Sequence, residues 1–254
     1  MNESSFNALK AKLDEAAQKY ETPAFIPNDP ISVPHRFTAL QDIEITALFA
    51  STIAWGNRTA ILKSCDKLLE IFEHAPYAFI VDSSDRDFAN IRKFYHRTFN
   101  GDDAFAFASA LRRLYRDEKR RSLETLFTAQ SADETLIDGI AHFRSEFCKD
   151  MLPHAKKHLG DMRGGSAAKR INLFLRWLVR SNQHGVDFGL WKTVSPAELF
   201  LPLDVHSARV SRALGILTRK SNDAKAVFEV TDVLKKFCPE DPVKYDFALF
   251  AVDV

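Results

Sequence analysis

The sequence predicts an all-α fold. Along most of the 254 residues, apolar side chains recur three or four positions apart, which is the spacing of one face of an α-helix. Few segments show the alternation of polar and apolar residues that marks a half-buried strand, and only residues 79–81 suggest a short one. Hydrophobic residues make up 46% and charged residues 27%, as in ordinary globular proteins, so the chain can bury a substantial core.

The N-terminal part is expected to contain three helices. Residues 4–20 have the spacing of an amphipathic helix, and the four prolines between residues 23 and 34 then predict an extended, non-helical connection. Helical spacing returns from Leu40, and a further helix is expected over residues 58–74. The Trp-Gly-Asn sequence at residues 55–57 is the predicted turn between these two helices.

The middle of the chain is also expected to be helical. Helices are predicted over residues 86–95, 102–115, 121–128 and 133–149, and the last of these is the most clearly amphipathic. Residues 150–165 are basic and show no regular spacing, so an irregular segment ending in two glycines is expected there.

The C-terminal part contains four predicted helices. Ser166 is a natural cap for a helix over residues 167–180. A loop then leads to a helix over residues 204–217. The last two helices are expected over residues 223–237 and 242–252.

Several classes of protein are excluded by composition. No apolar run approaches the roughly 20 residues that a membrane-spanning helix needs, and residues 1–19 lack the features of a secretory signal. The three cysteines lie more than eighty positions apart, which fits neither a disulfide framework nor a compact metal site. We therefore expect a cytoplasmic protein with no membrane partner and no metal ion, while nothing in the sequence indicates its oligomeric state.

The distribution of charge is uneven. The formal net charge of +1 does not by itself indicate a nucleic-acid-binding protein. Residues 156–220, however, hold twelve Lys or Arg against four Asp or Glu. Any surface that binds a polyanion is therefore expected to involve this stretch.

A glycine turn before a predicted helix is the first candidate site. Gly164 and Gly165 would let an anion such as a phosphate approach free backbone amides, although most such turns are only turns. Lys169 follows in the first helical turn, where the helix dipole and the neighbouring Arg170 both disfavour the charged ammonium. A neutral lysine amine can attack an electrophilic sugar carbon. The alternative is a surface lysine that serves only solubility.

Asp204 is the second candidate. It stands directly before an amphipathic helix, so its default role is that of an N-terminal cap. Capping and catalysis are compatible, because a carboxylate at a helix N-terminus is both rigid and kept ionised.

Together the two sites resemble a known superfamily. The segment LDVHSARVSRALGIL resembles the one that carries the catalytic aspartate in endonuclease III and related helix-hairpin-helix DNA glycosylases. Lys169, after a glycine hairpin, is similar to the lysine of the glycosylases that are also lyases. From about Phe25 to the C-terminus, five motifs resemble in order an uncharacterised bacterial family, domain of unknown function 2400: AWGNR, KRINLFLRWLVR, VDFGLW, LPLDVH and DPVKYDFALF.

The resemblance implies two helical lobes with a cleft between them. One lobe would comprise residues 40–180, including the hairpin and Lys169, and the other residues 1–39 with 181–254, including Asp204. The implied activity is that of a base-excision-repair DNA glycosylase and abasic-site lyase on damaged duplex DNA. Lys169 would be the amine nucleophile at the sugar C1′ and Asp204 the catalytic carboxylate, with no cofactor.

The resemblance also implies contacts with DNA and with an extruded base. Such enzymes hold the flipped base between flat side chains. The base pocket would involve Trp55, Asn57 and Trp191. A tryptophan in a turn between helices, such as Trp55, more often serves packing, and Trp191 is open to either role. The residues expected to contact DNA are Gly164, Gly165, Ser166, Arg170, His206 and Arg209.

Departures from the superfamily pattern keep other functions open. The hairpin reads GDMRGGSAAK where LPGVGxKTA is usual, and 35 positions separate Lys169 from Asp204, about twice the spacing in endonuclease III and nearer that of the archaeal 8-oxoguanine glycosylases. The cysteine cluster that binds iron and sulfur is absent, so no iron–sulfur cluster is expected. The alternatives are a non-catalytic nucleic-acid-binding protein and an enzyme acting on RNA or on a free nucleoside.

A pair of histidines has the spacing of a possible metal site. His154 and His158 stand four positions apart, as on one face of a helix, but no glutamate accompanies them. A solvent-exposed face is the expected arrangement.

Overall fold

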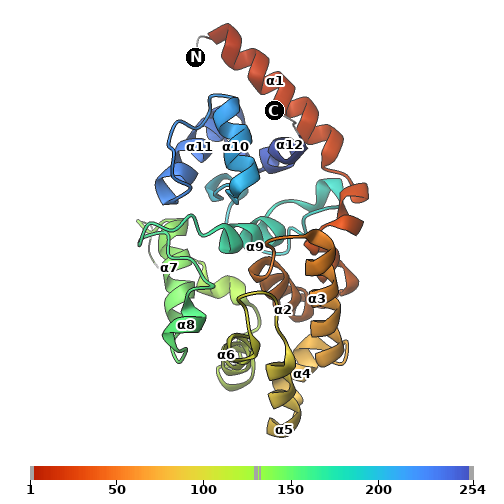
Figure 1. The fold of residues 1–254 in the computed structure, drawn as a ribbon. Coiled ribbons are helices and arrows are strands. Elements are labelled where there is room, and N and C mark those ends of the chain that lie inside the picture. The colour runs from red at the N-terminus through yellow and green to blue at the C-terminus, as the bar shows by residue number, and fades with distance from the viewer. Residues whose placement is uncertain (1–2, 129–130, 132, 252–254) are drawn as a thin grey trace. The chain divides into compact units, whose positions relative to one another are not determined.

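The computed structural model describes residues 3–128, 131 and 133–251, and throughout these ranges the regular structure is helical (Figure 1). No strand occurs among the described residues, apart from two isolated bridges, so the all-α prediction is confirmed. The short strand expected at residues 79–81 is wrong, because they lie in helix α4 (Pro76–Asp82). Its first residue is a proline, which is favoured at the start of a helix because its fixed φ suits the first turn. None of the described helices is long and apolar enough to span a lipid bilayer.

The chain forms two compact units. The terminal unit combines Met1–Ile26 with Asp161–Val254, and the central unit is Pro27–Gly160. These boundaries differ from the expected lobes, which divided the chain after residues 39 and 180. As a result, Lys169 and Asp204 belong to the same unit. The helix that begins at Lys169 packs within the terminal unit because its buried arginines pair with acidic residues at both ends of the chain.

The central unit is built around helix α2 (Leu40–Thr52), whose residues from Ile43 onward are all buried. A cluster of phenylalanines forms the core, with the ring of Phe49 lying 5.5 Å from that of Phe72 and 6.0 Å from that of Phe107. The other helices of this unit are α3 (Arg58–Ile71), α4, α5 (Asp85–Phe88), α6 (Gly101–Arg112), α7 (Leu136–Phe147) and α8 (Pro153–Lys156).

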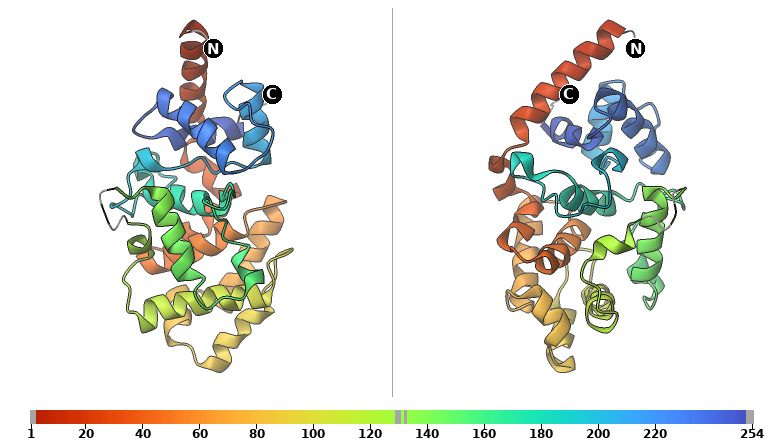
Figure 2. Two further views of the ribbon diagram at one scale, coloured as in Figure 1. Left: turned by 90° about the vertical axis from the view of Figure 1, so that its left-hand side faces the viewer. Right: turned by 180° about the vertical axis from the view of Figure 1, so that it is seen from behind.

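The helices of the terminal unit are α1, α9, α10, α11 and α12. Their bounds are Glu3–Tyr20, Lys169–Val179, Val205–Ala213, Ala224–Phe237 and Tyr245–Ala251. Helix α1 packs along α12, as both views in Figure 2 also show. The hydroxyl of Tyr245 donates to Asp14 at 2.8 Å, and the ammonium of Lys244 lies 2.8 Å from the same carboxylate.

The proline-rich segment is not extended as predicted. It forms three 3-10 helices, Pro23–Asn28, Pro30–Ser32 and Pro34–Arg36, each beginning with a proline. Proline is suited to this position because its fixed φ matches a helical turn and the first amide of a helix has no internal partner. Closely spaced prolines therefore start successive short turns here.

Several predicted helices are shorter than expected. The helix expected over residues 58–74 ends at Ile71, and Glu73 and His74 then adopt positive φ angles of 53° and 56°. Other expected helices end early or divide into an α-helical and a 3-10 or π part; these are residues 86–95, 102–115, 121–128, 204–217 and 242–252, of which residue 252 lies outside the described residues. The irregular segment at residues 150–165 contains the short helix α8.

Candidate active site

Lys169 and Asp204 meet within the terminal unit. The Nζ atom of Lys169 lies 3.6 Å from Oδ2 of Asp204, although the two residues are 35 positions apart in the sequence. Lys169 is the first residue of α9 and Asp204 the N-terminal cap of α10, so each is held by the start of a helix. Their side chains are 27% and 42% exposed, which leaves both accessible to a substrate.

Asp204 caps α10, as predicted, and belongs to a capping box with Ser207. The backbone N–H of Ser207 donates to Oδ1 of Asp204 at 2.8 Å, and the N–H of Asp204 donates to Oγ of Ser207 at 2.8 Å. Burial acts to raise the pKa of the Asp204 carboxyl, but Lys169 and the hydrogen bonds from Ser207 outweigh it and hold this pKa below its usual range. Asp204 is therefore a fixed carboxylate that is ionised at neutral pH.

The start of α9 is set by Ala168 rather than by Ser166. Ala168 is buried and adopts φ 44° and ψ 37°, a left-handed conformation that is uncommon for a residue with a side chain. The buried side chain of Asn172 donates to the carbonyl of Ala167 at 3.1 Å, and its N–H donates to the carbonyl of Ala168 at 3.0 Å. These bonds fix the backbone directly before Lys169. The predicted Ser166 cap is thus wrong, because the hydroxyl accepts only from the N–H of Ala168, before the helix begins.

Arg170 follows Lys169 and is partly buried. Burial lowers the pKa of its guanidinium to about 10, which leaves it protonated at neutral pH. The sequence therefore places a permanent cation beside Lys169, as expected.

The glycine turn uses its amides internally. The N–H of Gly164 donates to the Asp161 carboxylate at 3.1 Å, and that of Gly165 donates to the carbonyl of Met162 at 3.1 Å. The N–H of Ser166 donates to the carbonyl of Asp161 at 2.8 Å. The three amides that the sequence offered to a phosphate therefore already have partners within the turn.

His206 and Arg209 lie on the first turns of α10, close to Asp204 in sequence. The Nε2 atom of His206 lies 3.2 Å from the carbonyl oxygen of Phe250, so this ring links α10 to α12. Arg209 is exposed, and its guanidinium lies 3.4 Å from Nδ1 of His206.

The three residues predicted for a base pocket have different surroundings. Trp55, in the central unit, is half-buried, and its ring lies 5.1 Å from that of His96. Asn57 caps α3 by accepting from the N–H of Ala60 at 3.1 Å. Trp191 belongs to the core of the terminal unit, where it is 1% exposed and stands edge-on to Phe174. Asn57 and Trp191 thus have structural roles of their own.

The expectation that both His154 and His158 are solvent-exposed is wrong for His158. This residue is buried, and its Nε2 atom lies 3.0 Å from the fully buried carboxylate of Asp103, whereas His154 is exposed. A buried carboxylate at the start of α6 requires partners; the N–H of Asn100 donates to it at 3.0 Å, and His158 lies beside it. Within the described ranges, no three His, Cys, Asp or Glu side chains gather as metal ligands would.

A buried ion-pair network, which was not expected from the sequence, joins Arg176 and Arg180 to acidic residues of the terminal unit. Arg176 pairs with Asp187 at 3.3 Å and with Asp246, and Arg180 pairs with Asp187 at 2.5 Å and with Asp241 at 2.7 Å. Glu21, which follows α1, also lies 2.9 Å from Arg180. The signal for this network was two arginines four positions apart in a helix that is otherwise buried, since such charges need partners.

Several basic residues of the stretch over residues 156–220 have partners within the fold. Arg176 and Arg180 are buried in the ion-pair network, and Arg212 donates to the carbonyls of Arg219 and Lys220. Arg219 in turn pairs with Asp223 at 2.5 Å. Part of the positive charge expected to bind a polyanion therefore holds the terminal unit together.

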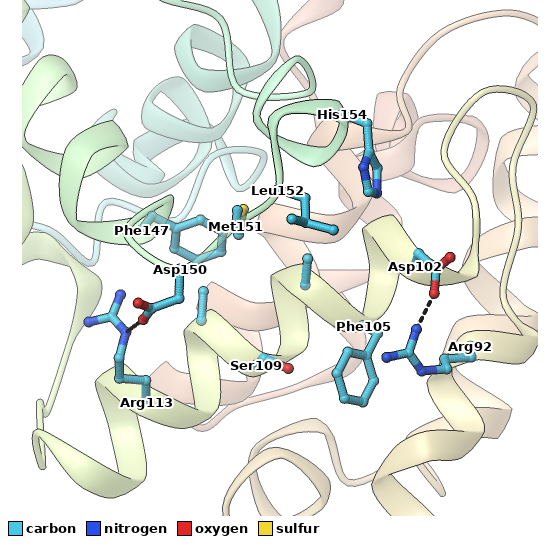
Figure 3. A pocket seen from close by; sticks show the side chains of 12 residues that line it. Arg92, Asp102, Phe105, Ser109, Arg113, Phe147, Asp150, Met151, Leu152 and His154 are labelled. Carbon is cyan, nitrogen blue, oxygen red and sulfur yellow. Dashed lines mark hydrogen bonds and ion pairs between the residues drawn. The ribbon is translucent and has the colours of Figure 1, made fainter.

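The central unit has a hollow of about 490 Å³ on α6 (Figure 3). An Arg92–Asp102 pair lies at one end and an Arg113–Asp150 pair at the other, with apolar side chains of α6 and of the segment after α7 between them. None of the residues predicted for catalysis lines this hollow. The hollow is therefore separate from the Lys169–Asp204 pair, which lies in the terminal unit.

The chain matches a protein family whose function is unknown. A family profile described as "protein of unknown function (DUF2400)" matches residues 29–254. No curated protein and no solved structure matches the chain significantly.

Proposed function

Because the chain belongs to the DUF2400 family of proteins of unknown function, membership implies no activity, and we propose one from the site itself. The protein is a cytoplasmic DNA glycosylase and abasic-site lyase of the helix-hairpin-helix type, acting on damaged duplex DNA. The observation that carries this proposal is the 3.6 Å approach of the Lys169 amine to the Asp204 carboxylate. The motif resemblance around Asp204 supports the same activity.

The two side chains have complementary roles in the proposed reaction. After losing a proton, Lys169 attacks the sugar C1′, the N–C1′ bond forms, and the bond to the base breaks. The base leaves with the electron pair and takes up a proton. Loss of a further proton from the amine and opening of the sugar ring, whose oxygen takes up a proton, give a Schiff base. Removal of a proton from C2′ then forms a C2′–C3′ double bond and expels the 3′ phosphate. The ionised Asp204 stabilises the positive charge that develops on the sugar.

The lowered pKa of Asp204 fits this division of roles. Burial alone would raise this pKa, and the ammonium of Lys169 and the Ser207 hydrogen bonds reverse the effect. A carboxylate held ionised and fixed in place can stabilise a cation without reorganising during the reaction.

A free nucleoside is a second candidate substrate. The amides of the glycine turn already have internal partners, and several arginines of the basic stretch are used within the fold. Both observations reduce the number of groups that could bind a polyanionic DNA backbone. The chemistry at C1′ would be the same for a free nucleoside as for DNA.

Borohydride trapping tests the proposal. Wild-type protein incubated with an abasic-site duplex and borohydride should form a covalent adduct, because the reagent reduces the Schiff base between Lys169 and the sugar to a stable amine. Lys169→Ala should abolish the adduct and Lys225→Ala, at an exposed position of α11, should not. Asp204→Asn should slow its formation on the order of 100-fold or more.

The remaining outcomes separate the alternatives. Binding of the duplex with steep salt dependence but no adduct would favour a non-catalytic nucleic-acid-binding protein. Release of base from a nucleoside or from RNA, measured by chromatography, would favour those substrates instead. A panel of single-lesion duplexes then identifies the base.

A further inference from the structure

One face of α9 carries two ion pairs in succession. Lys169 and Arg176 are seven residues, or two helical turns, apart and so lie on the same face. Lys169 pairs with Asp204, the cap of α10, and Arg176 pairs with Asp246 in the first turn of α12. Because α10 packs against α12, and His206 bonds to Phe250, the two carboxylates belong to adjoining elements.

Arg176 pairs with a second carboxylate besides that of Asp246. Its Nε atom also donates to Asp187 at 3.3 Å, and Asp187 is fully buried. The connected network contains two arginines and four carboxylates, so its acidic members are in excess; these are Glu21, Asp187, Asp241 and Asp246. Asp246 therefore shares the positive charge of Arg176 with another carboxylate.

Burial of Asp246, whose side chain is 15% exposed, raises the pKa of its carboxyl, and the negative charge of Asp204 raises it further. Arg176 and Lys169 act in the opposite direction. The geometry agrees, because α12 packs against the helix that Asp204 caps and Arg176, the partner of Asp246, shares a face of α9 with Lys169. The charge of Asp246 is therefore coupled to the charges of the pair.

The other charged groups around α12 have separate partners. From α1, Asp14 faces Tyr245 and Lys244. Asp241, which directly precedes the 3-10 helix Pro242–Lys244, faces Arg180. From α10, His206 bonds to a carbonyl of α12, and the charged groups that act most strongly on Asp246 are Arg176, Asp204 and Lys169.

We propose that Asp246 is a positioning residue of the Lys169–Asp204 site, whose charge sets the pH range over which the Lys169 amine is reactive. When ionised, Asp246 favours the ammonium form of Lys169. When it takes up a proton, it releases that hold, so the amine becomes available at lower pH. The consequence for catalysis rests on the proposed function, whereas the coupling itself does not.

Acylation of Lys169 by acetic anhydride tests the coupling without DNA, because the reagent attacks only the unprotonated amine. Its extent is followed against pH by peptide mass spectrometry. Asp246→Asn keeps an oxygen for Arg176 and should lower the pH midpoint of Lys169 acylation by about half a pH unit. This shift corresponds to about threefold more free amine at any pH below the midpoint. Asp246→Glu should restore the wild-type midpoint, and Asp241→Asn, on the same network but facing Arg180, should leave it unchanged.

Asp204→Asn serves as the positive control, because it removes a charge 3.6 Å from the amine and must lower the midpoint. If Asp246→Asn does not fold, Asp246→Ser replaces it. The inference is overturned if Asp246→Asn has the same acylation midpoint as the wild type, or if Asp241→Asn shifts that midpoint equally. If Asp246→Asn shows the shift but the wild-type protein traps no abasic DNA, the proposed function is refuted and the inference stands.

Discussion

Ser207 donates its backbone N–H to Oδ1 of Asp204 at 2.8 Å, while Oδ2 of the same carboxylate faces Lys169. The capping box thus determines which oxygen is presented to the amine. Asp204 could not both cap α10 and meet Lys169 if the side chain were free to rotate.

Ser207→Ala should weaken this arrangement. The variant keeps the Ser207 N–H but loses the hydroxyl that completes the capping box, and a lost cap typically costs about 1 kcal/mol of stability. Urea unfolding measures the loss. Ser221→Ala, at an exposed position in the same unit, is the control and should unfold like the wild type.

The Asp204 carboxylate should make stability depend on pH in the acid range. Its folded-state pKa is lowered, so its contribution is fully present above the unfolded-state pKa and is lost as pH falls through the folded value. Asp204→Asn should therefore be less stable than the wild type at pH 7, and the difference should shrink below about pH 4. Unfolding curves at several pH values check this, and a difference independent of pH would contradict it.

Arg180→Met should be strongly destabilising. The side chain of Arg180 is 3% exposed; burial acts to lower its pKa, but Asp187 and Asp241 outweigh burial and raise it. Removing one partner of a buried ion network leaves uncompensated charge and costs about 3–5 kcal/mol. Arg86→Met, on the surface of the central unit, should change the denaturant midpoint little.

The two tryptophans predicted for a base pocket should respond differently. Trp191→Ala empties a site in the core and should cost about 3–5 kcal/mol. Trp55→Ala, at a half-buried position, should cost less. Unfolding of both variants distinguishes packing from recognition, since wild-type stability in Trp191→Ala would mean that this ring is not part of the core.

The sequence predicted the elements that depend on local signals. The helix after Asp204 begins where predicted because a capping aspartate and a regular apolar face lie within a few residues. The start of α9 was missed because the left-handed Ala168 is held by Asn172 and not by its own side chain.

Contacts between residues far apart in the sequence could not be predicted from local patterns. The approach of Lys169 to Asp204 was expected from the resemblance, because no local pattern relates residues 35 positions apart. The partners of Arg180 include Glu21, which is 159 positions away, so only tertiary structure reveals them. This pairing also explains why the unit boundaries differ from the expected lobes.

Helix α1 lies outside residues 29–254, which the family profile matches, yet it packs along α12, the helix that carries Asp246. Asp14 on α1 has its pKa lowered to about 2; burial opposes this shift, and bonds from Lys10, Lys244 and Tyr245 produce it. A protein trimmed to the family boundary would lose this partner of Lys244 and Tyr245, as well as the Glu21 partner of Arg180. Recombinant work on this chain should therefore retain its first 28 residues.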